Sequence, residues 1–525
     1  MRASPARRRP TAPTVVTLML AVALLAAACS SGSGIKFRST TTQPASTSHS
    51  GSADTGDTAA SDTTGGSTDS SQSLGQKLSW TDCDGGFQCA TLRVPLDYRQ
   101  PQAKKITLGL ARRPAANRRQ RIGSLLVNPG GPGVSAIDFM ENGDFPAALT
   151  QRFDLVGVDP RGVGRSTKVN CHEKPAALYT PDPTMEDQAD IDRYLQVGRA
   201  YVAQCKADNG ALLQHVGSRD TARDMDEVRK ALGEDKLTFA GFSYGTVLGA
   251  TYADLFPDKV RAIVIDGVVD TSKSGIEGAR FQADGFELAL SHFLADCQSQ
   301  GASCPAGPDP SAVLDRVTAK VEAVPIPSAT SVRPAGPGEL NLALGQAMYS
   351  KELWPKLAQA LADADRGDGG GLVQLANDYL RVANGDEEGT QFDGYFAIGC
   401  VDQAWPRDPA VVLAAAKQAA TTAPHFGEAL MNDYVRCALW PAPSDPITPP
   451  KAAGSPPILV VGTTGDPATP YQASVDMAKR LPKGVLLTFQ GEGHVAFGTS
   501  QCVTDAETQY LLTLRPPPDG TRCTN

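Results

Sequence analysis

Short apolar segments alternate with helix-like segments over much of this 525-residue chain. Between them lie stretches with helical spacing, such as 219–233, where apolar residues recur on one face and Gly233 closes the run. Strands that alternate with helices pair in parallel, and the helices cover both faces of the sheet. The pattern predicts an α/β fold on a mostly parallel sheet, with strands within 105–113, 122–131, 153–162, 236–240, 260–269, 456–466 and 484–494.

The alternation stops between about 271 and 450. This stretch has a mostly helical pattern and contains Pro/Gly-rich breaks such as 321–338. Because predicted sheet strands flank it on both sides, we interpret 271–450 as a helical cap inserted into an α/β core. The core is then formed by 76–270 and 451–525. A chain this long exceeds what one compact core normally holds, which agrees with an inserted domain.

The first 75 residues differ in composition from the rest. A basic start is followed by an apolar run with small residues before Cys29, as in a secretory signal peptide over 1–28. The apolar run is short for a membrane span. The segment "LLAAAC" resembles a bacterial lipobox, so Cys29 is a candidate lipidation site, and ordinary cleavage nearby is the alternative. Residues 29–75 are rich in Ser, Thr, Gly and Asp and predict a disordered tether.

Ten of the eleven cysteines follow Cys29. An even number in an exported chain favours disulfides. Sequence alone fixes no connectivity, but the spacing favours five short-range pairs: Cys83–Cys89, Cys171–Cys205, Cys297–Cys304, Cys400–Cys437 and Cys502–Cys523.

The sequence lacks the patterns typical of zinc binding and of nucleic-acid binding. The six histidines form no H-E-x-x-H and no C-x-x-C occurs, so we expect no zinc site, and the chemistry below needs no other cofactor. The net charge of −8 and the lack of a long basic run in the part expected to fold argue against a nucleic-acid partner. The sequence makes no prediction of oligomeric state.

The segment 236–249 reads "KLTFAGFSYGTVLG" and places G-x-S-x-G between a predicted strand and a predicted helix. This is the nucleophile elbow of α/β-hydrolases. Gly241 and Gly245 leave room for a tight turn that lifts Ser243 above the sheet edge. The motif alone can also occur by chance in a chain of this length. The partner residues therefore decide whether it marks a catalytic serine.

A serine hydroxyl needs a base to take its proton, and the base needs an acid to orient it. In this fold the chain order is Ser, Asp, His. Asp466 directly follows one predicted strand and His494 directly follows the next. An aspartate before Pro467 is also typical of a turn. The ordered set nevertheless predicts a catalytic triad of Ser243, Asp466 and His494.

An acyl intermediate also needs donors for its oxyanion. One is expected from the N–H of Tyr244, the residue after the nucleophile, and the other from the glycine-rich loop 128–135, "NPGGPGVS". We name Gly131 as the second donor. The alternative is a plain Gly/Pro turn.

Six segments in this order resemble the secreted actinobacterial tripeptidyl aminopeptidase and proline iminopeptidase branch of the α/β-hydrolases, over about 80–525. They are "CATLRVPLDY", "NPGGPG", "DPRGVGRS", "GFSYG", "GDPATP" and "GEGHVAF". Pro129 replaces the histidine of the H-G-G-P-G of iminopeptidases, as in the tripeptidyl type. The resemblance implies an α/β-hydrolase fold, release of peptides from free N-termini, and the same triad.

An enzyme of this kind must pair the substrate's ammonium with a carboxylate, because a lone buried charge is costly. Asp402 in "FAIGCVDQAWPRD" is our candidate, between Cys400 and Trp405. The alternative is a surface or helix-capping aspartate.

Two rival functions remain open. A carboxylesterase or lipase uses the same triad on esters, and a non-catalytic surface binding protein would use the scaffold alone. We favour peptide substrates for an exported chain, either lipid-anchored on the outer face of the cell membrane or secreted.

Overall fold

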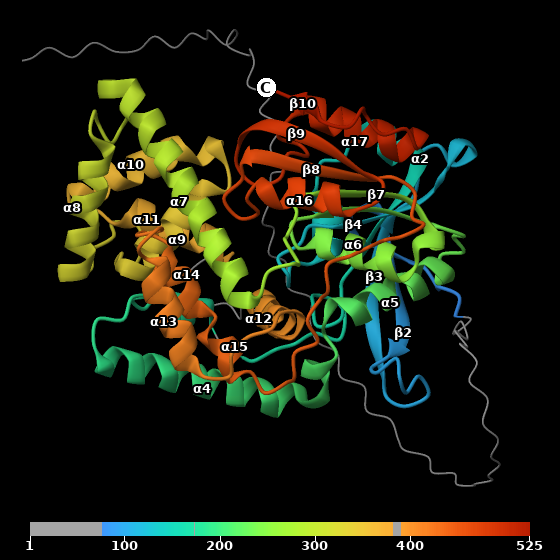
Figure 1. Ribbon diagram of the computed structural model, residues 1–525, viewed down its shortest axis with the longest axis horizontal. Helices are drawn as coiled ribbons and strands as arrows, with labels where there is room; N and C mark the ends of the chain where they lie inside the picture. The colour runs from blue at the N-terminus through green and yellow to red at the C-terminus, as the bar shows by residue number, and fades with distance from the viewer. Residues whose placement is uncertain (1–75, 173, 382–389, 525) are drawn as a thin grey trace, which may run out of the picture. The chain divides into compact units, whose positions relative to one another are not determined.

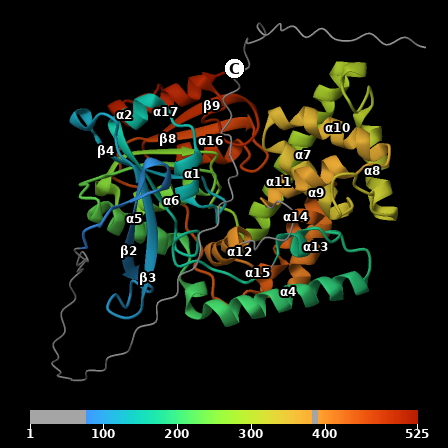
Figure 2. The ribbon, with the colours of Figure 1, turned by 180° about the vertical axis from the view of Figure 1, so that it is seen from behind.

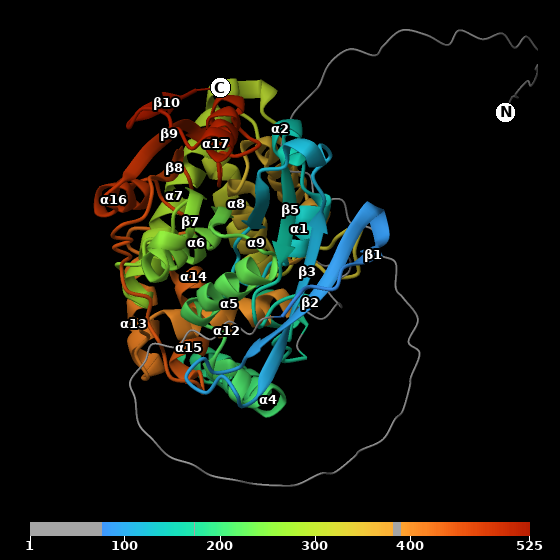
Figure 3. The same ribbon diagram turned by 90° about the vertical axis from the view of Figure 1, so that its right-hand side faces the viewer.

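The computed structural model describes residues 76–172, 174–381 and 390–524 (Figure 1). Within these ranges lies a ten-stranded sheet of order β1-β2-β3-β5-β4-β6-β7-β8-β9-β10. In Figure 3, β10 and β1 lie at its opposite edges. Its strands are β1 (Thr81–Cys83), β2 (Phe87–Pro95), β3 (Lys105–Arg113), β4 (Gly123–Asn128), β5 (Phe153–Val158), β6 (Leu237–Phe242), β7 (Val260–Asp266), β8 (Ile458–Gly465), β9 (Gly484–Glu492) and β10 (Thr521–Cys523).

The sheet is parallel from β5 through to β10, which confirms the predicted mostly parallel arrangement. The strands from β1 to β3 are antiparallel, and β3 also pairs antiparallel with β5. The connection from β2 to β3 is short and is closed by a hydrogen bond from the Leu96 N–H to the Lys104 oxygen. A connection this short makes a hairpin and cannot contain a crossover helix.

Helices cover both faces of the sheet, as predicted. One face packs against α1 (Ala136–Asn142), α2 (Ala147–Arg152) and α17 (Gln501–Thr513), which Figure 2 labels. The other face packs against α5 (Ser218–Ala231), α6 (Gly245–Leu255) and α16 (Gln472–Arg480). The alternation of side chains along a strand explains the two layers, because neighbouring residues of β4 point to opposite faces.

Between β7 and β8 the described chain is helical, as the sequence predicted. The first five of these helices supply most of a hydrophobic cluster that includes Phe286, Leu344 and Leu361, whereas Phe396 and Ile398 of a later helix belong to the same cluster as one face of the sheet. We therefore retain the inserted helical cap as a proposal. The helices are α7 (Gly275–Gln300), α8 (Pro310–Ala323), α9 (Pro337–Met348), α10 (Trp354–Asp365), α11 (Gly370–Leu380), α12 (Thr390–Asp402), α13 (Pro409–Ala419), α14 (Gly427–Asp433) and α15 (Val435–Leu439).

The helices outside that range were only partly predicted from the sequence, and α3 (Pro175–Tyr179) and α4 (Gln188–Asn209) are among those that were not. The long helix α4 packs against α15, so the helical layer also contains chain from between β5 and α5 (Figure 1). Its sequence carries few large apolar side chains, which left no clear helical stripe to recognise. None of the helices in the described ranges is long and apolar enough to cross a membrane.

The five disulfides join the cysteines in the predicted pairs. Cys171–Cys205 ties α4 to the loop after β5, and Cys400–Cys437 ties α12 to α15. Cys502–Cys523 joins α17 to β10. The bridges therefore cross-link both the sheet layer and the helical layer. Cys29 lies outside the described residues.

We expect removal of the Cys400–Cys437 bridge, by changing both residues to alanine, to lower the free energy of unfolding by about 2–4 kcal/mol. The bridge closes a segment of 37 residues, against 6 for Cys83–Cys89. Because loop entropy grows with length, the longer bridge should contribute about 1.5 kcal/mol more. Denaturant unfolding of the Cys400→Ala/Cys437→Ala variant and of a Cys83→Ala/Cys89→Ala variant measures this difference in the free energy of unfolding. Equal unfolding midpoints with and without a reductant in the unaltered protein would contradict the prediction.

Candidate active site

Ser243 lies in the turn from β6 to α6 with a φ of 55°, the left-handed region that a residue with a side chain rarely adopts. The flanking glycines make the turn possible. A Cβ on Gly241 would lie 2.3 Å from the Gly245 oxygen, and one on Gly245 would lie 2.6 Å from the Asn128 oxygen. The two glycines of G-x-S-x-G are thus required by close backbone packing.

The backbone around Ser243 is held by hydrogen bonds from both sides. Its N–H donates to the main-chain oxygen of Asp266, the last residue of β7, at 2.9 Å. Its own carbonyl accepts the N–H of Thr246 at 2.9 Å and the hydroxyl of Thr246 at 2.6 Å. These bonds fix the strained turn against the neighbouring strand.

Asp466 and His494 are in direct contact. The Nδ1 of His494 lies 2.9 Å and 3.0 Å from the two carboxylate oxygens. Asp466 also accepts the N–H groups of Ala468 and Thr469 and the Thr469 hydroxyl. With Nδ1 donating its proton to this acceptor, Nε2 carries the lone pair of a neutral imidazole. The pair therefore has the arrangement of a base and its orienting acid.

The pKa of His494 is raised above the usual histidine value. Burial by itself lowers this pKa, but the nearby charge of Asp466 and its hydrogen bond outweigh burial, and Asp266 adds to the effect. The Asp466 side chain is fully buried. Protonated imidazole is thus stabilised here, as a general base requires after it has taken a proton.

Ser243 and His494 converge on the end of β7. The Ser243 N–H binds Asp266, and a Cβ on the next residue, Gly267, would lie 3.3 Å from Cε1 of His494. Ser243 and His494 both belong to the described part of the chain. No hydrogen bond there joins the Ser243 side chain to the His494 imidazole. Catalytic hydrogen bonds of this kind are often long until substrate binds.

The predicted oxyanion loop passes directly against the elbow. Gly130, Gly131 and Gly133 have φ angles of 98°, 105° and 94°. A Cβ on Gly130 would lie 2.5 Å from the Phe242 oxygen and 2.8 Å from the Tyr244 nitrogen. Tyr244 caps the start of α6, where N–H groups have no partner within the helix. The two predicted donors, on Gly131 and Tyr244, thus belong to neighbouring backbone segments.

Asp402 contacts Ser218, and within the described residues none of its hydrogen bonds reaches Asp466 or His494. It is the last residue of α12, is 8% exposed, and accepts the Ser218 N–H at 2.8 Å and the Ser218 hydroxyl at 2.5 Å. The Ser218 hydroxyl in turn lies 2.6 Å from the Tyr244 hydroxyl. Burial raises the pKa of Asp402 to about 7. Its predicted contact with a substrate ammonium stays a prediction, and both its oxygens already accept hydrogen bonds inside the protein.

Two residues near the site were not identified from the sequence. The main-chain oxygen of Tyr349 accepts the His494 N–H at 2.9 Å, and its ring meets the imidazole edge-on with centroids 5.4 Å apart. The Asp266 carboxylate accepts the N–H groups of Ala496 and Phe497 at 2.9 Å and 2.8 Å. For Asp266 the signal was a charged residue that ends a largely apolar strand. For Tyr349, in the helical region, the sequence carried no signal.

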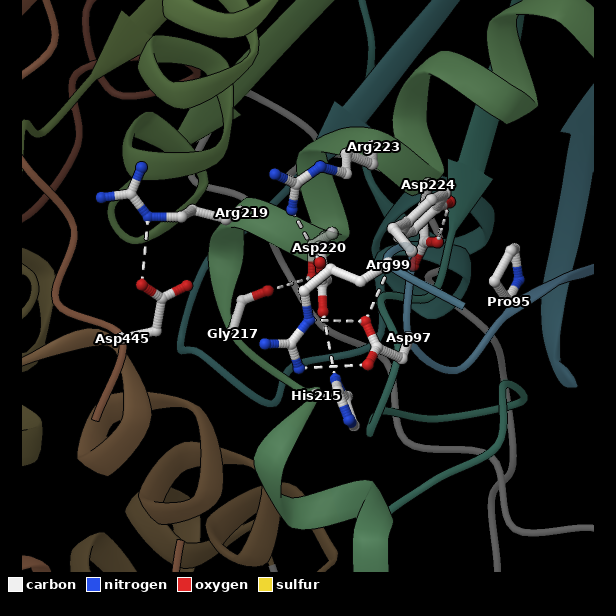
Figure 4. Close-up of polar contacts among 12 residues, drawn as sticks. Pro95, Asp97, Arg99, His215, Gly217, Arg219, Asp220, Arg223, Asp224 and Asp445 are labelled. Carbon is white, nitrogen blue, oxygen red and sulfur yellow. Dashed lines mark hydrogen bonds and ion pairs between the residues drawn. The ribbon is translucent and has the colours of Figure 1, made fainter. Parts of the chain in front are cut away.

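The first arginine of "DPRGVGRS", Arg161, is structural. It is fully buried, and its Nε and Nη2 donate to the two oxygens of Asp224 on α5, each at 2.7 Å. It also donates to the backbone oxygens of Pro95, Leu96 and His215. Figure 4 shows further ion pairs at the start of α5, Arg219 with Asp445 and Arg223 with Asp220. This network fixes α5 against the β2–β3 hairpin.

Comparisons with known proteins agree with this geometry. A sequence profile described as alpha/beta hydrolase fold matches residues 123–501. The chain is 37% identical over 488 residues to the serine protease Hip1 of Mycobacterium tuberculosis, covering 86% of this chain and 91% of that protein. It is 37% identical over 454 residues to carboxylesterase B of the same species, covering 83% and 86%. It is 32% identical over 478 residues to tripeptidyl aminopeptidase of Streptomyces lividans, covering 85% and 86%.

We expect His494 to titrate above 6.5, and the Asp466→Asn variant to lower its pKa, because the carboxylate supplies the largest effect that opposes burial. Histidine-selective NMR across a pH series measures this, and Asp82→Asn, on the edge strand β1, is the control. A wild-type His494 that titrates below 6.5, or one that Asp466→Asn leaves unchanged, would contradict the prediction.

Proposed function

Because the chain belongs to the α/β-hydrolase fold family, we propose that it is a serine hydrolase that releases short peptides from free N-termini through an acyl-enzyme. The observation that carries the proposal is the strained Ser243 elbow together with the Asp466–His494 pair at the same end of the sheet. No residue needs a cofactor for this chemistry.

In the proposed mechanism, Ser243 Oγ attacks the scissile carbonyl carbon while His494 Nε2 takes its proton. Asp466 keeps the imidazole in the required tautomer and stabilises the imidazolium. The N–H groups of Tyr244 and Gly131 donate to the oxyanion. His494 then gives its proton to the leaving amine. Water, activated by the same imidazole, hydrolyses the acyl-enzyme and frees Ser243.

The choice of peptide substrates rests on the relatives. Hip1 is named a serine protease and the Streptomyces relative a tripeptidyl aminopeptidase. A second candidate activity, ester hydrolysis, is supported by the similarity to carboxylesterase B at the same 37% identity. The triad serves both reactions, so recognition of the free amine separates them. A non-catalytic binding protein would have no use for a strained Ser243 and is the weakest alternative.

We also propose that the chain is exported and anchored by lipid on Cys29. The lipobox-like segment before Cys29 supports the anchor. The five disulfides of the described residues support an oxidising compartment outside the cytosol. In this arrangement the stretch 29–75 is the tether between the membrane surface and the enzyme.

The test of function is a panel of peptides with free amines, the same peptides N-acetylated, and a simple ester. We expect release of short peptides, tripeptides first, from the free forms and little cleavage of the acetylated forms. Ser243→Ala and His494→Ala should each lower kcat by about 10⁴-fold or more, because the triad acts as a unit.

Circular dichroism of each variant controls for folding. Near-normal turnover by folded Ser243→Ala would remove the triad assignment. Equal cleavage of free and acetylated peptides would replace the aminopeptidase by an endopeptidase. Cleavage of esters alone would favour the carboxylesterase.

For the anchor, we expect Cys29→Ala to move the protein from the membrane fraction to the soluble fraction of an expressing actinobacterial host. The reason is that the variant lacks the thiol that carries the lipid. Fractionation and mass spectrometry of the mature N-terminus measure this. Wild-type protein that begins at another residue and carries no lipid would refute the anchor.

A further inference from the structure

The last residue of α12 is connected to the nucleophile elbow by side-chain hydrogen bonds. Asp402 accepts the Ser218 hydroxyl at 2.5 Å, and the Ser218 oxygen lies 2.6 Å from the Tyr244 hydroxyl. All three residues are buried. Tyr244 follows Ser243 directly, and its backbone N–H is a proposed oxyanion donor. The chain of bonds thus runs from the helical region to the catalytic backbone.

We propose that Asp402, Ser218 and Tyr244 form a positioning chain that holds the Tyr244 backbone N–H where the oxyanion develops. The inference rests on the proposed acyl transfer at Ser243 but not on the choice of peptide over ester. Asp402 is then a positioning residue that acts through Ser218 and Tyr244. In this role it acts on the Tyr244 N–H from a distance and not through contact with the reacting atoms.

The direction of the hydrogen bonds follows from the groups present. An ionised carboxylate only accepts, so the Ser218 hydroxyl donates to Asp402. The Ser218 oxygen can then accept from the Tyr244 hydroxyl. Each proton points toward Asp402, and the carboxylate terminates the chain. A neutral amide at position 402 would donate to Ser218 and reverse this order, which leaves the buried Tyr244 proton without its acceptor.

Ser218, the middle residue of the positioning chain, is held by further contacts. Ser218 is the first residue of α5, and its N–H also binds Asp402. The following residue of α5, Arg219, reaches the segment before β8 through its ion pair with Asp445, drawn in Figure 4, and its hydrogen bond to the Pro446 oxygen. A Cβ on Gly217 would lie 3.0 Å from Asp402 Oδ1, so the backbone itself is close to the carboxylate.

The Asp402 end of the positioning chain is also held by backbone hydrogen bonds. The main-chain oxygens of Val401 and Asp402 accept the N–H groups of Asp445 and Ile447 at 2.7 Å and 2.9 Å. The end of α12 is therefore held by the segment before β8. Since both Asp402 and Ser218 are fixed, the Tyr244 hydroxyl has one defined place, and its ring orients the adjacent peptide unit.

The same helix offers a matched control. Asp393 on α12 is 2% exposed and accepts a backbone N–H, from Cys171 at 2.7 Å, and a hydroxyl, from Tyr201 at 2.8 Å. Asp402 shares these two kinds of contact. Neither Cys171 nor Tyr201 belongs to the elbow. A purely structural role for a buried acid on α12 is therefore measured by Asp393→Asn.

The experiment compares Asp402→Asn, Tyr244→Phe and Asp393→Asn in the full-length protein at pH 8. It measures kcat and KM on p-nitrophenyl acetate and the rate at which a fluorophosphonate labels Ser243. We expect Asp402→Asn and Tyr244→Phe each to lower kcat and the labelling rate by about 10–100-fold with KM changed less than threefold, since loss of one oxyanion donor costs about 10²–10³ in kcat. The double variant should be no slower than the slower single variant.

Asp393→Asn should lower the melting temperature and leave kcat of the folded protein within twofold of wild type. If Asp402→Asn does not fold, Tyr244→Phe tests the chain from its other end, because it keeps the ring and the backbone N–H. An effect of Asp402→Asn or Tyr244→Phe no larger than that of Asp393→Asn, or losses that multiply in the double variant, would overturn the proposal. Failure to cleave free-amine peptides with normal labelling of Ser243 would instead refute only the aminopeptidase assignment.

Discussion

Asp266 at the end of β7 is the residue on which the geometry of the site depends. Its main-chain oxygen accepts the Ser243 N–H, and its carboxylate accepts the N–H groups of Ala496 and Phe497, just after His494. Burial raises the pKa of Asp266 to about 6, and burial with the Asp266 charge raises that of the neighbouring Glu507. Two neighbouring buried carboxyls cannot both ionise cheaply, and Oδ2 of Asp266 is the atom that accepts both N–H groups. One strand end thus places both the proposed nucleophile and the loop that follows its proposed base.

The strain in the elbow is maintained by the packing around it. A residue with a side chain at a φ of 55° costs free energy and persists only where its surroundings leave no alternative. Here Gly130 lies against the elbow from one side, and the Thr246 hydroxyl and the Asp266 oxygen hold the Ser243 backbone from others. In the proposed mechanism the strain is useful because the same turn presents the serine side chain and places the next N–H, that of Tyr244, at the start of α6.

The sequence predicted the sheet and the Asp466–His494 contact because both follow from local patterns. Each candidate directly follows a strand, and parallel strands bring such ends to one edge. The disulfides were predictable because their partners lie close in sequence. The partners of Asp402 were not, because Ser218 lies 184 residues away and neither residue stands in a motif. The helix α4 was missed because its buried positions are few, and Arg161, although in a recognised segment, has a structural role that depends on Asp224 in a later helix.

The helical region between β7 and β8 does more than border the site, since it contacts three of the proposed catalytic elements. Tyr349 accepts the backbone N–H of His494, Asp402 reaches Tyr244 through Ser218, and a Cβ on Gly133 of the oxyanion loop would lie 2.1 Å from the Gln391 oxygen. In the proposed enzyme the same helices would also select the substrate. In that case a change at Tyr349, Gln391 or Asp402 that reshapes substrate binding would also change the support of the proposed base or oxyanion donors. In the proposed enzyme, substrate choice and catalytic geometry would therefore be coupled through these backbone contacts and the short series of buried hydrogen bonds.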